Sequence, residues 1–174
     1  MSLASKHCAS WIHSMLLIAS GILFYNAKAQ EKTKWLLGAG ITYDNYMNMP
    51  GINLNVTYRV VKGLHVGPDF SALLNRDESE NGVEVLKKEL EYNFNANYLL
   101  KISEGLSLYP LAGINFSKVT VHPINSEPSK KIITAMNLGG GLEIELKTFR
   151  IFFESKYVTQ LRKYDLTLGT LFKI

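Results

Sequence analysis

Cysteine is almost absent from this 174-residue sequence, which has a single one, Cys8, near its start. A scaffold held together by disulfides is therefore excluded. Long apolar runs are also missing: beyond residue 30 no such run exceeds three residues, far short of the roughly 20 that a membrane-spanning helix needs. A strong excess of charge of one sign is also missing, since the formal net charge is only +4. The 19 basic and 15 acidic residues are scattered without a Lys/Arg cluster, so we expect no nucleic-acid partner.

The first 29 residues have the three-part pattern of a secretory signal peptide. Lys6 is followed by a mostly apolar stretch from Trp11 to Tyr25, and then by Ala27-Lys28-Ala29 before Gln30. An N-terminal membrane anchor is the alternative, but the apolar stretch is short for a span. We therefore expect a signal peptide at 1–29 and one exported domain at 30–174.

The rest of the sequence alternates apolar and polar residues with a period of two, which is typical of β-strands with two different faces. The segment from Ile52 to Val60 is the clearest example, because every second residue is apolar and each one between is polar. Eight such runs are expected at 33–43, 51–60, 64–74, 87–102, 106–118, 132–146, 149–158 and 164–174. No segment shows an apolar stripe with helical spacing, so the predicted class is all-β.

The connections between these runs are 7, 3, 12, 3, 13, 2 and 5 residues long, so longer and shorter ones alternate. In an antiparallel up-and-down barrel this gathers the long connections at one end, as in outer-membrane barrels. The short connections 61–63 and 103–105 both end in glycine, which suits a three-residue hairpin. Such hairpins would pair Val60 with Leu64 and Ile102 with Leu106. A two-residue turn at Lys147-Thr148 would place Glu145 opposite Arg150.

The two faces of the predicted barrel differ in size, which indicates their orientation. The apolar face is too bulky for the interior of an eight-stranded barrel, whereas the other face is rich in Gly and Asn, so the apolar face should point outward into lipid. Its aromatic residues fall towards both ends of the strands, where interface belts form. The predicted membrane-interface aromatics are Trp35, Tyr43, Tyr58, Tyr92, Tyr98, Tyr157, Tyr164 and Phe172.

The inner face carries charges of both signs in nearly equal number. The predicted interior charge network consists of Arg59, Asp69, Glu91, Lys101, Glu143, Glu145, Arg150, Glu154, Lys156, Asp165 and Lys173. These groups form either a polar permeation path or a salt-bridged plug, and the small bore of eight strands favours the plug. Several apolar residues, among them Leu36, Phe152 and Leu171, depart from strict alternation and fall on this face.

The mature sequence resembles the small outer-membrane β-barrel proteins of the OmpX/OmpA-like type, especially the short barrel-domain proteins of Bacteroidota. The resemblance rests on the signal peptide and on three segments, Trp35–Tyr43, Leu138–Leu146 and Tyr164–Ile174. It implies an eight-stranded antiparallel up-and-down transmembrane barrel in the outer membrane of a Gram-negative cell, surrounded by outer-membrane lipid. It also implies that the barrel-assembly machinery reads the last strand. These proteins often end in Phe, whereas here Phe172 lies two residues before the terminal Ile174.

A catalytic site is not apparent in the sequence. His65 and His122 are the only histidines after the signal peptide, and no nucleophile motif, metal-ligand cluster or phosphate loop occurs. We therefore expect no enzyme activity and no cofactor. The leading hypothesis is a non-enzymatic outer-membrane barrel with a structural or surface-interaction role. A narrow channel or secretion-assembly component, and a soluble lipocalin-like carrier of an apolar ligand, remain the alternatives.

Overall fold

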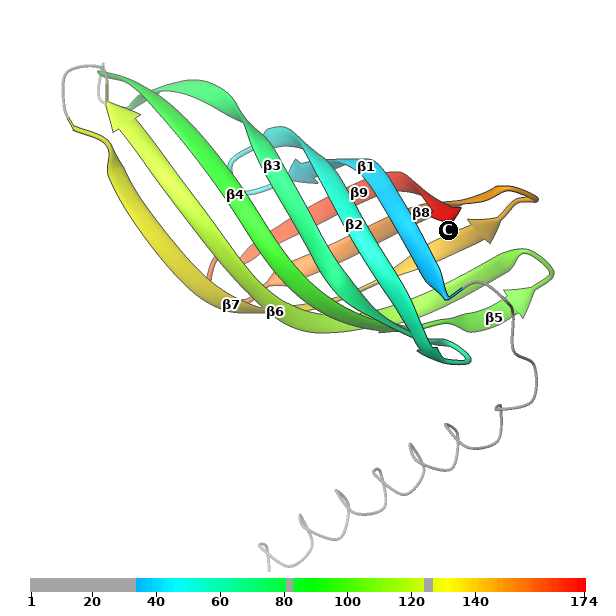
Figure 1. Cartoon of the computed structure of the whole chain (residues 1–174). Coiled ribbons are helices and arrows are strands. Elements are labelled where there is room, and N and C mark those ends of the chain that lie inside the picture. Colours follow the sequence, from blue (N-terminus) through cyan, green and yellow to red (C-terminus); the bar gives the residue numbers. More distant parts are fainter. Residues whose placement is uncertain (1–33, 81–82, 124–126) are drawn as a thin grey trace, which may run out of the picture. The chain divides into compact units, whose positions relative to one another are not determined.

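The computed structural model describes residues 34–80, 83–123 and 127–174 as a β-barrel (Figure 1). The predicted signal peptide lies outside the described residues. The strands are β1 (Trp35–Asp44), β2 (Met49–Val61), β3 (Leu64–Glu80), β4 (Val83–Tyr98), β5 (Leu100–Ser103), β6 (Leu106–Pro123), β7 (Ser129–Glu145), β8 (Phe149–Val158) and β9 (Lys163–Lys173). Within the described part of the chain, no helix is long and apolar enough to cross a membrane.

Every neighbouring pair of strands in the barrel is antiparallel. The order around the sheet is β4-β3-β2-β1-β9-β8-β7-β6-β5, and the additional pairing of β4 with β6 closes it. β4 and β5 are two parts of one strand, interrupted only at Leu99, and both pair with β6. The barrel is therefore an eight-stranded up-and-down barrel, as the alternation predicted.

The two ends of the barrel differ more in the height of the wall than in the length of the loops. The prediction of 12- and 13-residue connections at 75–86 and 119–131 is wrong, because β3, β4, β6 and β7 continue through most of both segments as paired strands of 16 to 18 residues. On the opposite wall β1, β2, β8 and β9 have only 10 to 13 residues. The four long strands consequently project beyond the short wall at one end (Figure 1).

The tight turns lie at the other end, beside the first residue of β1 and the last of β9. Gly63 and Gly105 have φ angles of +85° and +79°, which confirms that these turns need glycine. The expected pairing is off by one residue, since Val61 and Ser103, not Val60 and Ile102, lie opposite Leu64 and Leu106. A register shift precedes each turn, as a hairpin with a glycine bulge requires.

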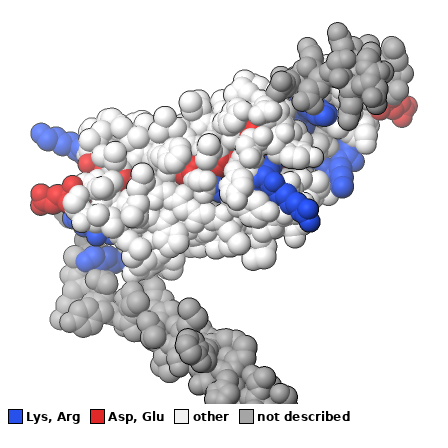
Figure 2. All heavy atoms as spheres, turned by 180° about the vertical axis from the view of Figure 1, so that it is seen from behind, with Lys and Arg blue, Asp and Glu red and all other residues white. Residues whose placement is uncertain are grey.

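Side chains alternate between an exposed apolar surface and a buried interior along most of each strand. In β9, for example, Leu166 and Leu168 are exposed, whereas Asp165 and Thr167 are buried. Figure 2 shows the resulting outer surface, which is largely uncharged between its two ends. Such an inverted arrangement, with apolar groups outside and charges inside, suits a lipid environment.

Candidate functional site

The interior of the barrel is the candidate site, because the buried ionisable and amide side chains gather there. They come from every wall of the barrel and form three groups along its axis. The uppermost group surrounds Lys163 near the end where the long strands project. The middle group surrounds Asp69, and the lowest surrounds Arg150, near the tight turns.

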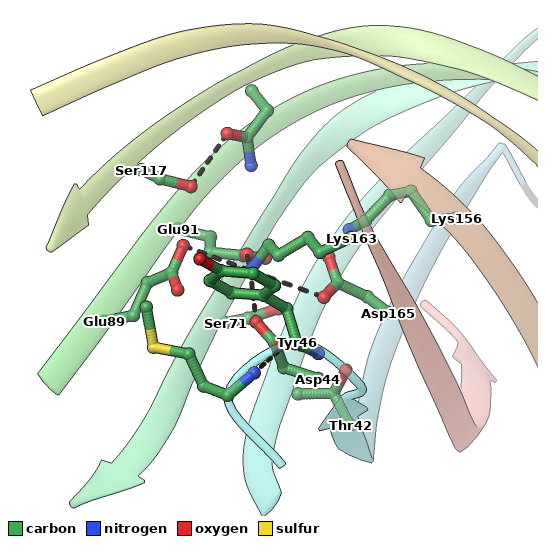
Figure 3. A network of polar contacts seen from close by, with 12 residues as sticks. Thr42, Asp44, Tyr46, Ser71, Glu89, Glu91, Ser117, Lys156, Lys163 and Asp165 are labelled. Carbon is green, nitrogen blue, oxygen red and sulfur yellow. Dashed lines mark hydrogen bonds and ion pairs between the residues drawn. The ribbon is translucent and has the colours of Figure 1, made fainter. Parts of the chain in front are cut away.

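Lys163, the first residue of β9, binds carboxylates from three strands (Figure 3). Its Nζ lies 2.7 Å from Asp44 Oδ2 and 3.1 Å from Glu89 Oε1, and it also donates a hydrogen bond to Glu91 Oε1. Asp165 Oδ1 is 3.4 Å from the same Nζ. All five side chains are almost completely buried, so four carboxylates share this ammonium group in a space with little water.

Asp69 on β3 occupies the centre of an amide network. Asn53 and Asn93 each donate to its Oδ1 over 3.0 Å, and Asn95 donates to Oδ2 over 3.3 Å. Lys156 Nζ lies 3.4 Å from the same Oδ2. The amides continue the network across the lumen through Asn115 and Asn137, both of which donate to Asn93 Oδ1 over 2.8 Å. Inner-face asparagine thus links β2, β4, β6 and β7 to the carboxylate on β3.

Arg150 on β8 is held by two glutamates of β7. Its Nη1 lies 3.0 Å from Glu143 Oε2, and its Nη2 lies 3.4 Å from Glu145 Oε1. Glu145 also accepts a hydrogen bond from Lys173 over 2.6 Å, at the more exposed edge of the group. Deeper in the barrel, the Tyr109 hydroxyl donates to Glu154 Oε2 over 3.0 Å.

The cavity found inside the barrel is small. A cavity of about 40 Å³ lies between the middle and lower groups, lined by Asn55, Asp69, Tyr109, Glu143 and Glu154 among others. That volume holds only a few water molecules. Leu36, Phe152 and Leu171, the apolar residues expected on the inner face, form a buried cluster that fills another part of the lumen. Across residues 34–80, 83–123 and 127–174, side chains therefore fill most of the interior.

The structure brings most of the expected charged residues together inside the barrel. Asp69, Glu91, Glu143, Arg150, Glu154, Lys156 and Asp165 belong to the three groups, with Glu145 and Lys173 at the lower edge. Arg59 is half-buried and donates to His65 Nε2 over 3.4 Å. Lys101 is not brought into the network, because β5 projects at the tight-turn end, where this lysine is exposed.

Sequence reasoning missed the most connected residue, Lys163, together with Asp44 and Glu89. Lys163 and Asp44 fell in the expected connections 159–163 and 44–50, whereas the structure makes them the first and last residues of strands. Glu89 was missed although it lies two residues before Glu91 and shares its face. Extending two of the expected runs by one residue would have found Lys163 and Asp44, and continuing the alternation from Glu91 within the run 87–102 would have found Glu89.

The expected interface aromatics lie on the outer surface near both ends of the barrel. The tilted rings of Trp35 and Tyr58 have centroids 4.7 Å apart at the tight-turn end, and those of Tyr157 and Tyr164 have centroids 4.9 Å apart at the other end. Phe172 packs against Phe149, with the two ring centroids 6.2 Å apart. Tyr43, Tyr92 and Tyr98 are likewise exposed or half-exposed. Among the described residues, no three His, Cys, Asp or Glu side chains form a group suited to a metal ion.

Several solved outer-membrane barrels are similar to this one. The attachment invasion locus protein Ail of Yersinia pestis aligns with a TM-score of 0.61 at 19% identity, over 83% of this chain and 100% of Ail. The N-terminal barrel domain of Pseudomonas aeruginosa OprF aligns with a TM-score of 0.61 at 17% identity, over 83% of this chain and 100% of the OprF domain. Neisserial surface protein A aligns with a TM-score of 0.58 at 13% identity, over 83% of this chain and 98% of the neisserial protein. These identities support a common fold.

A search of curated proteins finds no match to the chain. The sequence profile of the outer membrane protein beta-barrel domain, in contrast, matches residues 15–161, which is most of the chain. The closed barrel, its apolar outer surface and this match agree with one another. The chain belongs to the outer membrane protein beta-barrel domain family and is an outer-membrane protein.

Proposed function

We propose that this protein is a non-enzymatic outer-membrane barrel that acts at the cell surface and does not conduct solutes. The observation that carries the proposal is the filled lumen. Ion pairs, amides and an apolar cluster occupy it, and the cavity between them measures only about 40 Å³. A conducting path would require the buried ion pairs to separate, which is costly in a low-dielectric interior.

The part proposed to make surface contacts is the end where the long strands project. Hairpins β3–β4 and β6–β7 stand beyond the short wall (Figure 1), so they offer paired backbone and side chains on a rigid support. The structural neighbour Ail is named for attachment and invasion. That name supports a surface role for this chain as well.

Biogenesis is proposed to involve the barrel-assembly machinery, which would recognise the last strand. β9 presents Phe172 and the residue after its end, Ile174, on the outside, both largely exposed. Outward apolar and inward polar residues alternate from Lys163 to Leu168, and Phe172 resumes the outward apolar positions near the end of β9.

Conductance recording tests the proposal. The purified barrel, reconstituted in a planar bilayer, should give no stepwise currents under conditions in which a known porin does. Reproducible single-channel steps that disappear with a lumen substitution would show a channel and contradict the proposal. The surface role is tested by replacing residues 76–87 with a two-residue turn, which should leave the barrel folded and reduce the adhesion of cells that carry it.

A further inference from the structure

Three lysines mark the upper limit of the apolar outer surface on three adjacent strands. Starting from the middle of the barrel, the outward residues are apolar or uncharged, and the first charged one is Lys88 on β4, Lys118 on β6 and Lys130 on β7. The outward residues that precede them are Phe94, Tyr92 and Leu90 on β4, Ile114 and Phe116 on β6, and Met136, Thr134 and Ile132 on β7. The change from apolar to cationic therefore occurs within two neighbouring rows of the strand register on all three strands.

The strand register places these lysines side by side. Lys88 and Lys130 both pair with Thr120, from opposite sides, so they lie about 10 Å apart across two strand spacings. Lys118 lies in the adjacent row, opposite Leu90 and Ile132, which makes it a diagonal neighbour of both at about 7–8 Å. Flexible lysine side chains at these separations can reach one common anion.

The three lysine side chains are exposed, and among the residues that the structure describes none of them forms an ion pair. The acidic group around Lys163 lies on the other face of the wall, since Glu89 and Glu91 point into the barrel. On the outer face the next row of the strand register holds Leu86 and His122, and it continues to the acidic Asp77 on β3. Figure 2 shows exposed Lys and Arg side chains at this end of the molecule.

We propose that Lys88, Lys118 and Lys130 form a binding site for the phosphate group of an anionic lipid in the leaflet at the long-strand end. The row directly below the cluster holds Tyr92, Phe116 and Thr134, and the next row holds Phe94, Ile114 and Met136. These rows are mostly apolar and lie in the hydrocarbon or at its edge. A ligand at this height has its anionic group beside the lysines and its apolar part against those rows. A lipid headgroup satisfies both conditions, whereas a soluble anion uses only the first.

Lipid retention by the intact barrel tests the site. The full-length mature protein in detergent is titrated with phosphatidic acid or with phosphatidylcholine of the same acyl chains, and bound lipid is counted by native mass spectrometry. We expect one phosphatidic acid to be retained in preference to phosphatidylcholine. Each lysine near an anionic group contributes about fivefold to affinity. The triple variant Lys88→Gln, Lys118→Gln, Lys130→Gln should therefore lose at least about tenfold in affinity.

A matched control is available at the other end of the barrel, where Lys62, Lys101 and Lys147 are exposed on three separate hairpins. Their combined change to Gln removes the same charge and should affect retention much less, while Lys→Arg at the three site positions should preserve it. Heat-dependent gel mobility checks that each variant is folded. Equal losses in both triple variants, equal retention of the two lipids, or full displacement by the soluble polyanion sucrose octasulfate would overturn the proposal.

Discussion

Lys163 Nζ lies 2.7 Å from Asp44 Oδ2, which joins the first residue of β9 to the last residue of β1 inside the barrel. β1 and β9 are the first and last strands of the barrel, so this ion pair crosses the seam where the two ends of the sheet meet. Asp44 is also directly opposite Asp165 in that seam. Two carboxylates in opposite positions repel each other, and Lys163 is within 3.4 Å of both.

Removal of this ammonium group should therefore weaken the barrel. Lys163→Met leaves Asp44, Glu89, Glu91 and Asp165 buried without their shared cation, and the loss expected for breaking a buried ion pair is about 3–5 kcal/mol. The measurement is the urea concentration at which the heat-modifiable gel band disappears. Lys156→Met is the comparison and should cost less, because Asp69 keeps three amide donors.

A compensating change separates charge from packing at this seam. Adding Asp44→Asn and Glu91→Gln to Lys163→Met removes two of the uncompensated carboxylates and should restore part of the lost stability. If the triple variant were no more stable than Lys163→Met, the contribution of Lys163 would be one of packing.

Arg150 should couple more strongly to Glu143 than to Glu145. The contact with Glu143 is 3.0 Å long and buried on both sides, whereas Glu145 is 3.4 Å away, partly exposed and shared with Lys173. In double-mutant cycles with Gln at each position, we expect a coupling energy of about 1–3 kcal/mol for the first pair and below about 1 kcal/mol for the second. Urea unfolding in detergent measures both, and a larger coupling for Glu145 would contradict the geometry.

The period-two pattern was sufficient to predict the class, the number of strands and which face points outward. The pattern is strong because side-chain volume and polarity change at every residue, as in Leu166, Thr167 and Leu168. The same reasoning failed where composition changes along a strand. Residues 75–80 and 119–123 are polar or mixed because they stand beyond the apolar outer surface, so they resemble loop although they pair as strands.

The site was predictable in part for a related reason. Alternation assigned Asp69, Glu91 and Asp165 to the interior. It does not tell how high along the barrel axis a residue lies relative to residues on distant strands. The contact of Lys163 with Glu91 depends on that height, because β9 and β4 are not neighbours in the sheet. Strand stagger around a closed barrel sets this relation, and only the complete register of all the strands supplies it.

Export should remove the first 29 residues. The small residues Ala27 and Ala29 precede the expected cleavage site, so N-terminal sequencing of the protein recovered from outer membranes should begin at Gln30. Ala29→Arg should block or displace cleavage, and Lys28→Gln is a control that should leave it in place. An intact Met1 in the membrane-inserted protein would show that the segment is an anchor.

The orientation of the two faces can be tested at adjacent positions of β9. Leu168 is about half exposed on the outer surface, and near the middle of the strand it lies opposite Ile41 and Phe153, which are also exposed and apolar. A cation there would stand in the hydrocarbon, so Leu168→Arg should destabilise the inserted barrel by about 2–4 kcal/mol. Leu168→Ala is the control for lost side-chain area and should cost less. Equilibrium unfolding from lipid vesicles measures both, and the Arg variant should also assemble less efficiently.

Thr167 precedes Leu168 in the chain and points into the barrel, so a substitution there should have a different effect. Its hydroxyl donates to Thr42 Oγ1 over 3.0 Å and its side chain is buried in the lumen. Thr167→Val keeps the shape and removes the hydrogen bond, so it should cost only about 1 kcal/mol, without a dependence on the thickness of the bilayer. The cost of Leu168→Arg, in contrast, should fall in thinner bilayers, because the cation then lies closer to water. If Leu168→Arg were harmless in every bilayer, the apolar surface would not face lipid at this position.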